Sequence, residues 1–211
     1  MVQLDKALFV HIPKTGGTWV RELLLENNGV KFSYPHDLPQ HHTKKIKKLK
    51  LEPFCFVRHP LELLYSLWKH WSGDENCRLN NLNPELYWQW DKKEYGFLLA
   101  ECIVEGDINA TVSNFVTKYP GFFSAILDKY SKRCKYIGRY ENIKEDLMDI
   151  VFKANGEVQE HLLIDIYANK KVNESKGNEG SLSKELALRF ISKEPACFLY
   201  NYTYLPEFVS Q

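Results

Sequence analysis

The chain reads Phe9-Val10-His11-Ile12-Pro13-Lys14-Thr15-Gly16-Gly17-Thr18 close to its start. The apolar run from Leu8 to Ile12 predicts a short buried strand that ends at Pro13. Beyond the two glycines, the segment from Trp19 to Leu25 predicts a helix. A strand, a glycine turn and a helix in this order form a cradle for an anion such as phosphate, because glycines admit a close approach and the N–H groups at the helix start point at the anion.

The position of Lys14 distinguishes this loop from the common nucleotide-binding loops. In the triphosphate loop, G-x-x-x-x-G-K-[ST], the lysine follows the last glycine, whereas Lys14 precedes both glycines. The loop also differs from the dinucleotide pattern G-x-G-x-x-G. A plain strand-to-helix turn accounts for a Gly-Gly pair alone, but the order Pro-Lys-Thr-Gly-Gly-Thr-Trp is far more specific.

A second strand-to-helix segment lies further along the chain. Residues 54–57 predict a buried strand that ends in Arg58-His59-Pro60, and Ser66 follows eight positions after Arg58. Arg58 would lie at the carboxyl end of its strand, where open α/β sheets bind ligands. Pro60 suits the first turn of a helix, and Ser66, which carries a hydroxyl donor, lies two turns along that helix.

Together these two segments resemble the sulfotransferases that use 3′-phosphoadenosine 5′-phosphosulfate (PAPS), and more closely the carbohydrate-sulfating group than the small-phenol group. The resemblance implies an α/β fold in a single domain over residues 1–211, with a P-loop-like strand–loop–helix and a central, mostly parallel sheet flanked by helices. It implies that Lys14 reaches the bridging and sulfuryl oxygens, that Arg58 and Ser66 grip the 3′-phosphate, and that Trp19 lies against adenine. The implied 5′-phosphate site comprises Thr15, Gly16, Gly17 and Thr18, which complete the cofactor site next to Lys14.

Two later segments resemble the same family more weakly. Gly138-Arg139-Tyr140-Glu141-Asn142 is similar to the strand-end Tyr-Glu-Asp of the family, which implies that Tyr140 contacts adenine. Asn173-Glu174-Ser175-Lys176-Gly177 is similar to the loop that closes over the 3′-phosphate, although serine stands where cytosolic members have arginine. Lys176 is therefore the donor that this loop would offer.

The residue that accepts the proton of the acceptor is left open by the sequence. The segment before the second strand carries His36, His41 and His42, and in the carbohydrate-sulfating group a histidine at this place faces the acceptor. Histidine suits this task because its pKa is near neutrality. We favour His41 or His42, with His36 and the carboxylate of Glu22 as alternatives.

Composition excludes several classes of protein. The 211 residues suffice for one α/β domain, and a net charge of +1 gives no overall field that would attract nucleic acid. No apolar run approaches the length of about 18 residues that a membrane span needs, so we expect no span. The start lacks a signal-peptide pattern and the five cysteines lack metal-ligand spacing, so we expect a cytoplasmic protein with reduced thiols.

The remaining chain predicts alternating helices and strands. We expect helices over 44–51, 96–105, 122–132, 143–155, 158–168, 183–192 and 194–204, and a strand over 135–138, whereas 106–120 is ambiguous. The lysines of the 44–51 helix predict a solvated basic face, or a surface that attracts anionic acceptors, rather than a nucleic-acid site. Residues 72–120 predict an insertion that shapes the acceptor site.

The predicted reaction is transfer of a sulfuryl group from PAPS to a hydroxyl or amine, with a glycan as the first expected acceptor and adenosine 3′,5′-bisphosphate as product. We expect no metal, because Lys14, the helix start and Arg58 supply positive charge. One alternative is a P-loop kinase of a nucleoside or small molecule, which would need magnesium and a lysine after the glycines. The other is a non-catalytic nucleotide-binding module, which would bind the nucleotide without turnover. The sequence does not indicate an oligomeric state.

Overall fold

The chain divides into two compact units in the computed structural model, which describes residues 1–34, 37–73, 101–168 and 180–210. The sheet unit comprises Met1–Arg58 and Leu127–Glu174, and the helical unit comprises His59–Ile126 and Ser175–Gln211. The single domain over residues 1–211 stays a prediction. Among the described residues, no helix is long and apolar enough to cross a membrane.

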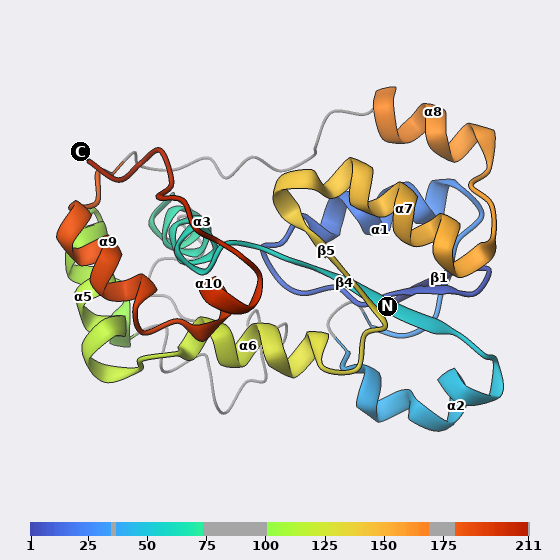
Figure 1. Ribbon diagram of the computed structural model, residues 1–211, viewed down its shortest axis with the longest axis horizontal. Helices are drawn as coiled ribbons and strands as arrows, with labels where there is room; N and C mark the ends of the chain where they lie inside the picture. The colour runs from blue at the N-terminus through green and yellow to red at the C-terminus, as the bar shows by residue number, and fades with distance from the viewer. Residues whose placement is uncertain (35–36, 74–100, 169–179, 211) are drawn as a thin grey trace. The chain divides into compact units, whose positions relative to one another are not determined.

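The described strands of the sheet unit form one mixed sheet (Figure 1). Its order is β3-β1-β2-β4-β5. The pairs β2–β4 and β4–β5 are parallel, whereas β1 is antiparallel to both β2 and β3. The strands are β1 (Val2–Leu4), β2 (Ala7–Phe9), β3 (Val30–Lys31), β4 (Glu52–Val57) and β5 (Tyr136–Arg139).

The α/β class is confirmed, but the prediction of a mostly parallel sheet is wrong. The chain turns back at Asp5, whose φ is 51°, so that β1 and β2 form an antiparallel hairpin. The predicted first strand, Leu8 to Ile12, also leaves the ladder early, at Phe9. Val10 still donates its N–H to the Phe54 carbonyl at 2.8 Å, and Ile12 stays fully buried. The segment is therefore as buried as its sequence predicts but regular over a shorter length.

Helices cover one face of this sheet (Figure 1). The helices α1 (Gly17–Glu26) and α7 (Ile143–Asn155) pack on the strands, and α8 (Glu160–Ala168) packs on both helices. In α7 the buried residues recur at the helical period and the helix ends at Gly156, whose φ of 88° suits glycine. The predicted helices over 143–155 and 158–168 are thus confirmed within two residues.

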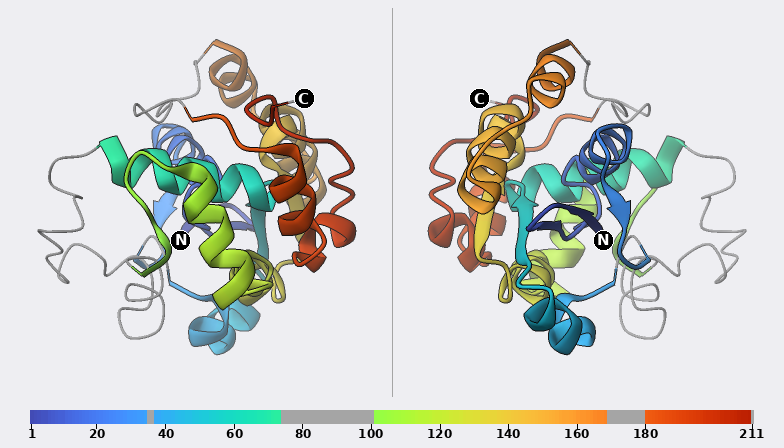
Figure 2. Two further views of the ribbon diagram at one scale, coloured as in Figure 1. Left: turned by 90° about the vertical axis from the view of Figure 1, so that its left-hand side faces the viewer. Right: turned by 90° about the vertical axis from the view of Figure 1, so that its right-hand side faces the viewer.

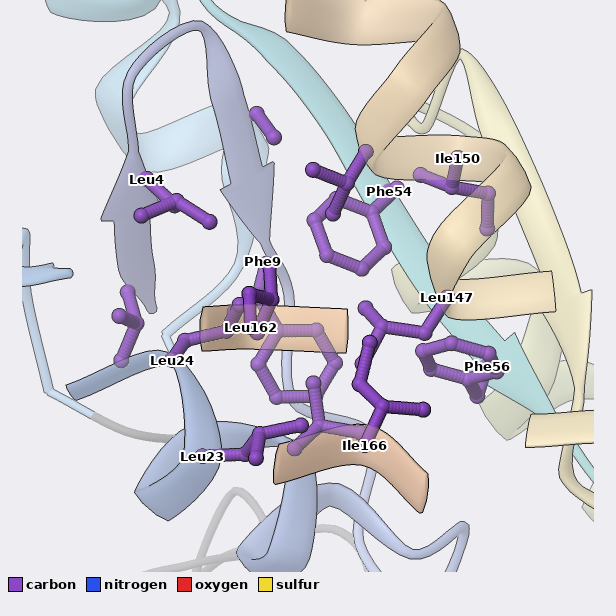
Figure 3. Close-up of a cluster of buried hydrophobic side chains, with 14 of the residues drawn as sticks. Leu4, Phe9, Leu23, Leu24, Phe54, Phe56, Leu147, Ile150, Leu162 and Ile166 are labelled. Carbon is purple, nitrogen blue, oxygen red and sulfur yellow. The ribbon is translucent and has the colours of Figure 1, made fainter. Parts of the chain in front are cut away.

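A single apolar cluster joins these helices to the strands (Figure 3). Phe54 and Phe56 are two positions apart on β4, so their side chains lie on the same face of the sheet. Both rings point into the cluster. Burying each such side chain stabilises the fold by about 1.5–3 kcal/mol, which fixes the start of α1 against the carboxyl ends of the strands. The labelled members of the cluster are Leu4, Phe9, Leu23, Leu24, Phe54, Phe56, Leu147, Ile150, Leu162 and Ile166.

A basic segment precedes β4 in the sheet unit. The 3-10 helix η1 (Pro39–His42) leads into α2 (Thr43–Lys48), so the predicted helix over 44–51 is shorter and begins one residue earlier. Ile46 is buried in α2, whereas Lys44, Lys45, Lys47 and Lys48 are exposed. This distribution is that of an amphipathic helix with a solvated basic face.

The helical unit is built on three helices that pack on one another. They are α3 (Pro60–Gly73), α5 (Ile108–Lys118) and α9 (Lys184–Ile191), and α5 and α9 lie side by side in Figure 1 and Figure 2. The ambiguous segment 106–120 therefore contains a helix, which Asp107 caps by accepting the Ala110 N–H at 2.9 Å. Residues 74–100 of the predicted insertion lie outside the described residues, and its role at the acceptor site stays a prediction.

A buried carboxylate organises the rest of the helical unit. Glu194 accepts the N–H groups of Phe123 (3.3 Å) and Ser124 (2.8 Å) at the start of α6 (Phe122–Ser131). The Ser124 hydroxyl donates to Glu194 and accepts the Ala196 N–H, at the start of α10 (Pro195–Leu199). The predicted helix over 194–204 ends at Leu199, because the chain reverses through Asn201, whose φ is 56°.

Candidate functional site

Three of the predicted site segments meet at one edge of the sheet. The loop with Lys14 follows β2, Arg58 comes directly after β4, and Tyr140 comes directly after β5. These three strands are parallel and adjacent, so their carboxyl ends lie along the same edge. This edge is where open α/β sheets bind their ligands.

The loop after β2 has a constrained backbone. Lys14 has a φ of 62° and Gly16 a φ of 78°, so both lie in the left-handed region. The fully buried Thr15 donates its hydroxyl to the Ile12 carbonyl at 2.9 Å, which closes the loop. The Thr15 hydroxyl therefore stabilises the loop by bonding to its backbone. The backbone N–H of Thr15, rather than its hydroxyl, could reach an anion.

The helix α1 begins at Gly17 with no side-chain cap. The Val20 N–H bonds to the Gly16 carbonyl at 3.3 Å, and the geometry of an α-helix leaves the preceding amides of Gly17, Thr18 and Trp19 without an intrahelical acceptor. Such amides, together with the helix dipole, favour an anion at the helix start.

The two glycines have a packing role that the sequence alone did not indicate. A Cβ on Gly16 would lie 2.7 Å from Ile143 Cδ1 and 2.9 Å from Tyr140 Cδ2. A Cβ on Gly17 would overlap the edge of the His11 ring at Cδ2 and Nε2. Glycine is required at both positions because these side chains approach the loop closely, whether or not an anion also does.

Arg58 connects the three segments. Its Nη1 donates to the Lys14 carbonyl at 3.2 Å, and its guanidinium carbon lies 4.3 Å from the centroid of the Tyr140 ring. Arg58 is half-buried, so both contacts are partly shielded from solvent. The structure thus brings together the predicted residues Lys14, Gly16, Arg58 and Tyr140.

Two further predicted cofactor residues, Trp19 and Ser66, are buried. Trp19 is 3% exposed and belongs to the apolar cluster under α1, and its indole N–H has no acceptor among the described residues. Ser66 is buried on α3 in the helical unit. Lys176 lies outside the described residues. The adenine contact of Trp19 and the phosphate contacts of Ser66 and Lys176 stay predictions.

The candidate bases differ in their surroundings. His41 is exposed on η1, whereas His42 is half-buried, with Nε2 3.1 Å from Asp37 Oδ2 and its ring edge-on to Phe32 at 5.6 Å. Glu22 lies on α1 and pairs with Arg21 at 3.6 Å, and His36 lies outside the described residues. The partner Asp37 was not predicted, although it precedes His42 by only five residues.

The His42–Asp37 pair lies at the same sheet edge as the Lys14 loop. Because β3 and β2 are both antiparallel to β1, they run in the same direction, and Phe32 comes directly after β3 at this edge. The strands β3 and β2 are separated by β1, which corresponds to roughly 10 Å. Phe32, which the His42 ring contacts, therefore lies at the same edge of the sheet as the Lys14 loop.

Comparison with known proteins adds no relative. No protein-family model matches the chain, and no curated protein matches it. Among the described residues, no group of three or more His, Cys, Asp or Glu could hold a metal ion. Any function assigned to the site thus depends on its own residues and geometry.

Proposed function

We propose that the chain is a PAPS-dependent sulfotransferase that modifies a hydroxyl or amine, with a glycan as the first candidate acceptor. The observation that supports this most is the contact of Arg58 with the Lys14 loop and Tyr140 at the carboxyl edge of β2, β4 and β5. A P-loop-like cradle binds one anion at the α1 start, with Lys14 as its cation. Arg58, which follows a different strand, places a second cation next to that cradle.

The residues fit a nucleotide that carries two separate phosphates. The amides at the α1 start would hold a 5′-phosphate, and Thr18, half-buried beside them, could add its hydroxyl. Arg58 suits a second phosphate because a guanidinium binds phosphate oxygens in a fixed fork geometry. A ligand with a single phosphate would use only one of the two groups.

Each residue has a defined task in sulfuryl transfer. When bound, PAPS supplies a sulfuryl group that is activated by its link to the 5′-phosphate. The Lys14 ammonium would offset the negative charge that develops on the leaving oxygen, and the α1 amides would hold that charge in place. As in phosphoryl transfer, positioning and charge stabilisation carry most of the rate enhancement.

His42 is the stronger candidate for the base. If His42 donates its Nε2 hydrogen to Asp37, its Nδ1 carries the lone pair that can accept a proton from the acceptor group. Asp37 would then fix the tautomer and ring orientation of His42, as the carboxylate does in other acid–base dyads. Exposed His41 has no such partner among the described residues.

A turnover experiment tests the proposed function. The whole chain is incubated with PAPS and a panel of glycan, phenol and amine acceptors, and release of adenosine 3′,5′-bisphosphate is measured by chromatography. We expect acceptor-dependent release that Lys14→Ala lowers by about 100-fold or more. The matched control, Lys44→Ala, changes an exposed lysine of α2 and should keep the wild-type rate.

Three results would contradict the proposal. A wild-type rate of turnover in Lys14→Ala would contradict the proposed role of Lys14. Binding of the nucleotide without turnover of any acceptor would favour a non-catalytic module. Magnesium-dependent consumption of ATP in place of PAPS would favour a kinase.

A further inference from the structure

Tyr140 contacts both phosphate-binding groups of the proposed site. We infer that Tyr140 is a positioning residue: it holds the Arg58 guanidinium ready for the 3′-phosphate and so sets the preference for a 3′-phosphorylated nucleotide. This inference rests on the proposed function and replaces a direct contact of Tyr140 with adenine.

The ring of Tyr140 contacts both the Lys14 loop, at Gly16, and the Arg58 guanidinium. Arg58 places its guanidinium carbon 4.3 Å from the ring centroid, and the Tyr140 atoms Cδ2 and Cε2 would lie 2.9 and 3.0 Å from a Cβ on Gly16. The ring can approach the loop this closely only because residue 16 is glycine. The loop, the ring and the guanidinium are therefore packed as one group.

The Tyr140 ring and the Lys14 carbonyl together restrain the Arg58 guanidinium. The guanidinium charge over the Tyr140 ring is attracted to the negative face of that ring. Arg58 Nη1 donates a hydrogen bond of 3.2 Å to the Lys14 carbonyl, and this bond restrains the rotation of the guanidinium. An arginine restrained in this way loses less rotamer entropy when it binds a ligand.

The backbone around Tyr140 is itself held in place. Tyr140 begins the 3-10 helix η4 (Tyr140–Asn142) between β5 and α7. Just before it, the Arg139 N–H donates to Asp146 Oδ2 at 2.6 Å, and just after it, Ile143 is buried in the apolar cluster. The ring position is therefore set by the sheet unit before any ligand binds.

The other end of β5 offers a matched control. Tyr136 donates its hydroxyl to Glu52 at 2.8 Å, and the Lys135 ammonium lies 5.1 Å from its ring centroid. Tyr136→Leu therefore removes a tyrosine and a cation–ring contact from the same strand, at the edge opposite the proposed site.

The test is calorimetric titration of the whole chain with adenosine 3′,5′-bisphosphate and with 5′-AMP. We expect Tyr140→Leu to lower the preference for the bisphosphate about 3- to 30-fold, with a smaller change in the affinity for 5′-AMP, because the contact with the Arg58 guanidinium is lost. Tyr140→Phe keeps the ring and should keep the preference, as should Tyr136→Leu. An unchanged preference in Tyr140→Leu, or an equal loss of affinity for both ligands, would overturn the inference.

A second variant covers the case in which Tyr140→Leu does not fold. Arg58→Lys keeps the positive charge but lacks the flat group that lies over the ring, so it should lower the preference to a similar extent. A wild-type preference in Arg58→Lys would overturn the inference. The titration of the wild-type chain tests the proposed function separately. If wild type showed no preference for the bisphosphate over 5′-AMP, the proposed function would be contradicted regardless of the results for the variants.

Discussion

The starts of two helices solve the same chemical problem in opposite ways. In the helical unit, α6 begins at a carboxylate of the protein, because Glu194 accepts the N–H groups of Phe123 and Ser124. In the sheet unit, α1 begins without a side-chain cap and has Lys14 and Arg58 close to its start. One helix start is filled by an internal anion, whereas the other combines open amides with cations. This difference supports the proposal that the α1 start binds an external anion.

The largest expected effect is at the open helix start. Gly17→Ala should lower the free energy of unfolding by about 3 kcal/mol or more, because the added Cβ would overlap the edge of the His11 ring and the loop is tightly packed. Chemical denaturation measures this change. The control is Gly106→Ala, where nothing lies within 4 Å of an added Cβ and only the φ of 72° opposes the substitution, at a cost of about 1 kcal/mol. Equal losses in both variants would contradict the close packing of the α1 start.

The next effect is at the filled helix start. Glu194→Ala should lower the free energy of unfolding by about 2–3 kcal/mol, because it leaves two amides at the α6 start without their acceptor in a buried site. The exposed Glu101 serves as control, since Glu101→Ala removes a carboxylate that faces solvent and should change stability little. A Glu194→Ala variant as stable as wild type would show that the amides find other partners.

A pH-dependent effect sharpens the same comparison. Burial raises the pKa of Glu194 above its ordinary value of 4.5, and the hydrogen bonds from Ser124 and Phe123 offset only part of this rise. Compared with the unfolded chain, the folded state therefore binds a proton more tightly at Glu194. The resulting stabilisation is complete below pH 4.5 and is lost as the pH rises through the raised pKa of the folded state.

Glu194→Gln removes this titration. Unfolding curves across pH should show wild type losing stability relative to Glu194→Gln as the pH rises above 4.5, by about 1.4 kcal/mol for each unit of the pKa rise. A constant difference between the two proteins over this range would contradict the burial effect.

The smallest effect separates stability from function at the α1 start. Lys14 adopts a φ of 62°, so Lys14→Gly should raise the free energy of unfolding by about 1 kcal/mol while it abolishes the proposed sulfuryl transfer. Lys50 has a φ of 52° and is exposed, so Lys50→Gly should give a similar gain and leave transfer unchanged. A loss of stability in Lys14→Gly would show that the lysine side chain stabilises the unliganded loop.

The local patterns of the sequence predicted most of the sheet unit. The apolar runs ending at Pro13 and Arg58 and the periodic segment 143–155 are read directly because one residue type recurs at a fixed spacing. The antiparallel hairpin was missed because β1 has only three residues, Val2–Leu4, and its turn residues, Asp5 and Lys6, lack the usual glycine. A strand of that length carries too little alternation to predict.

The contacts that organise the two helix starts could not be predicted in the same way. Arg58 and Tyr140 are far apart in the sequence, as are Glu194 and Ser124, and each pair forms only when the fold is complete. Local motifs placed Lys14, Gly16 and Arg58 at one edge of a sheet. They gave no signal for the Tyr140–Arg58 contact or for the pairing of His42 with Asp37.

The most direct test compares three ligands in calorimetric titrations of the wild-type chain: adenosine 3′,5′-bisphosphate, 5′-AMP, and ATP with magnesium. We expect the bisphosphate to bind about tenfold or more tightly than 5′-AMP, because a charged hydrogen bond to the second phosphate contributes about 1.5–3 kcal/mol. Equal affinities for the bisphosphate and 5′-AMP, or tighter binding of ATP with magnesium, would contradict a site in which Arg58 and the open start of α1 hold two phosphates of one nucleotide.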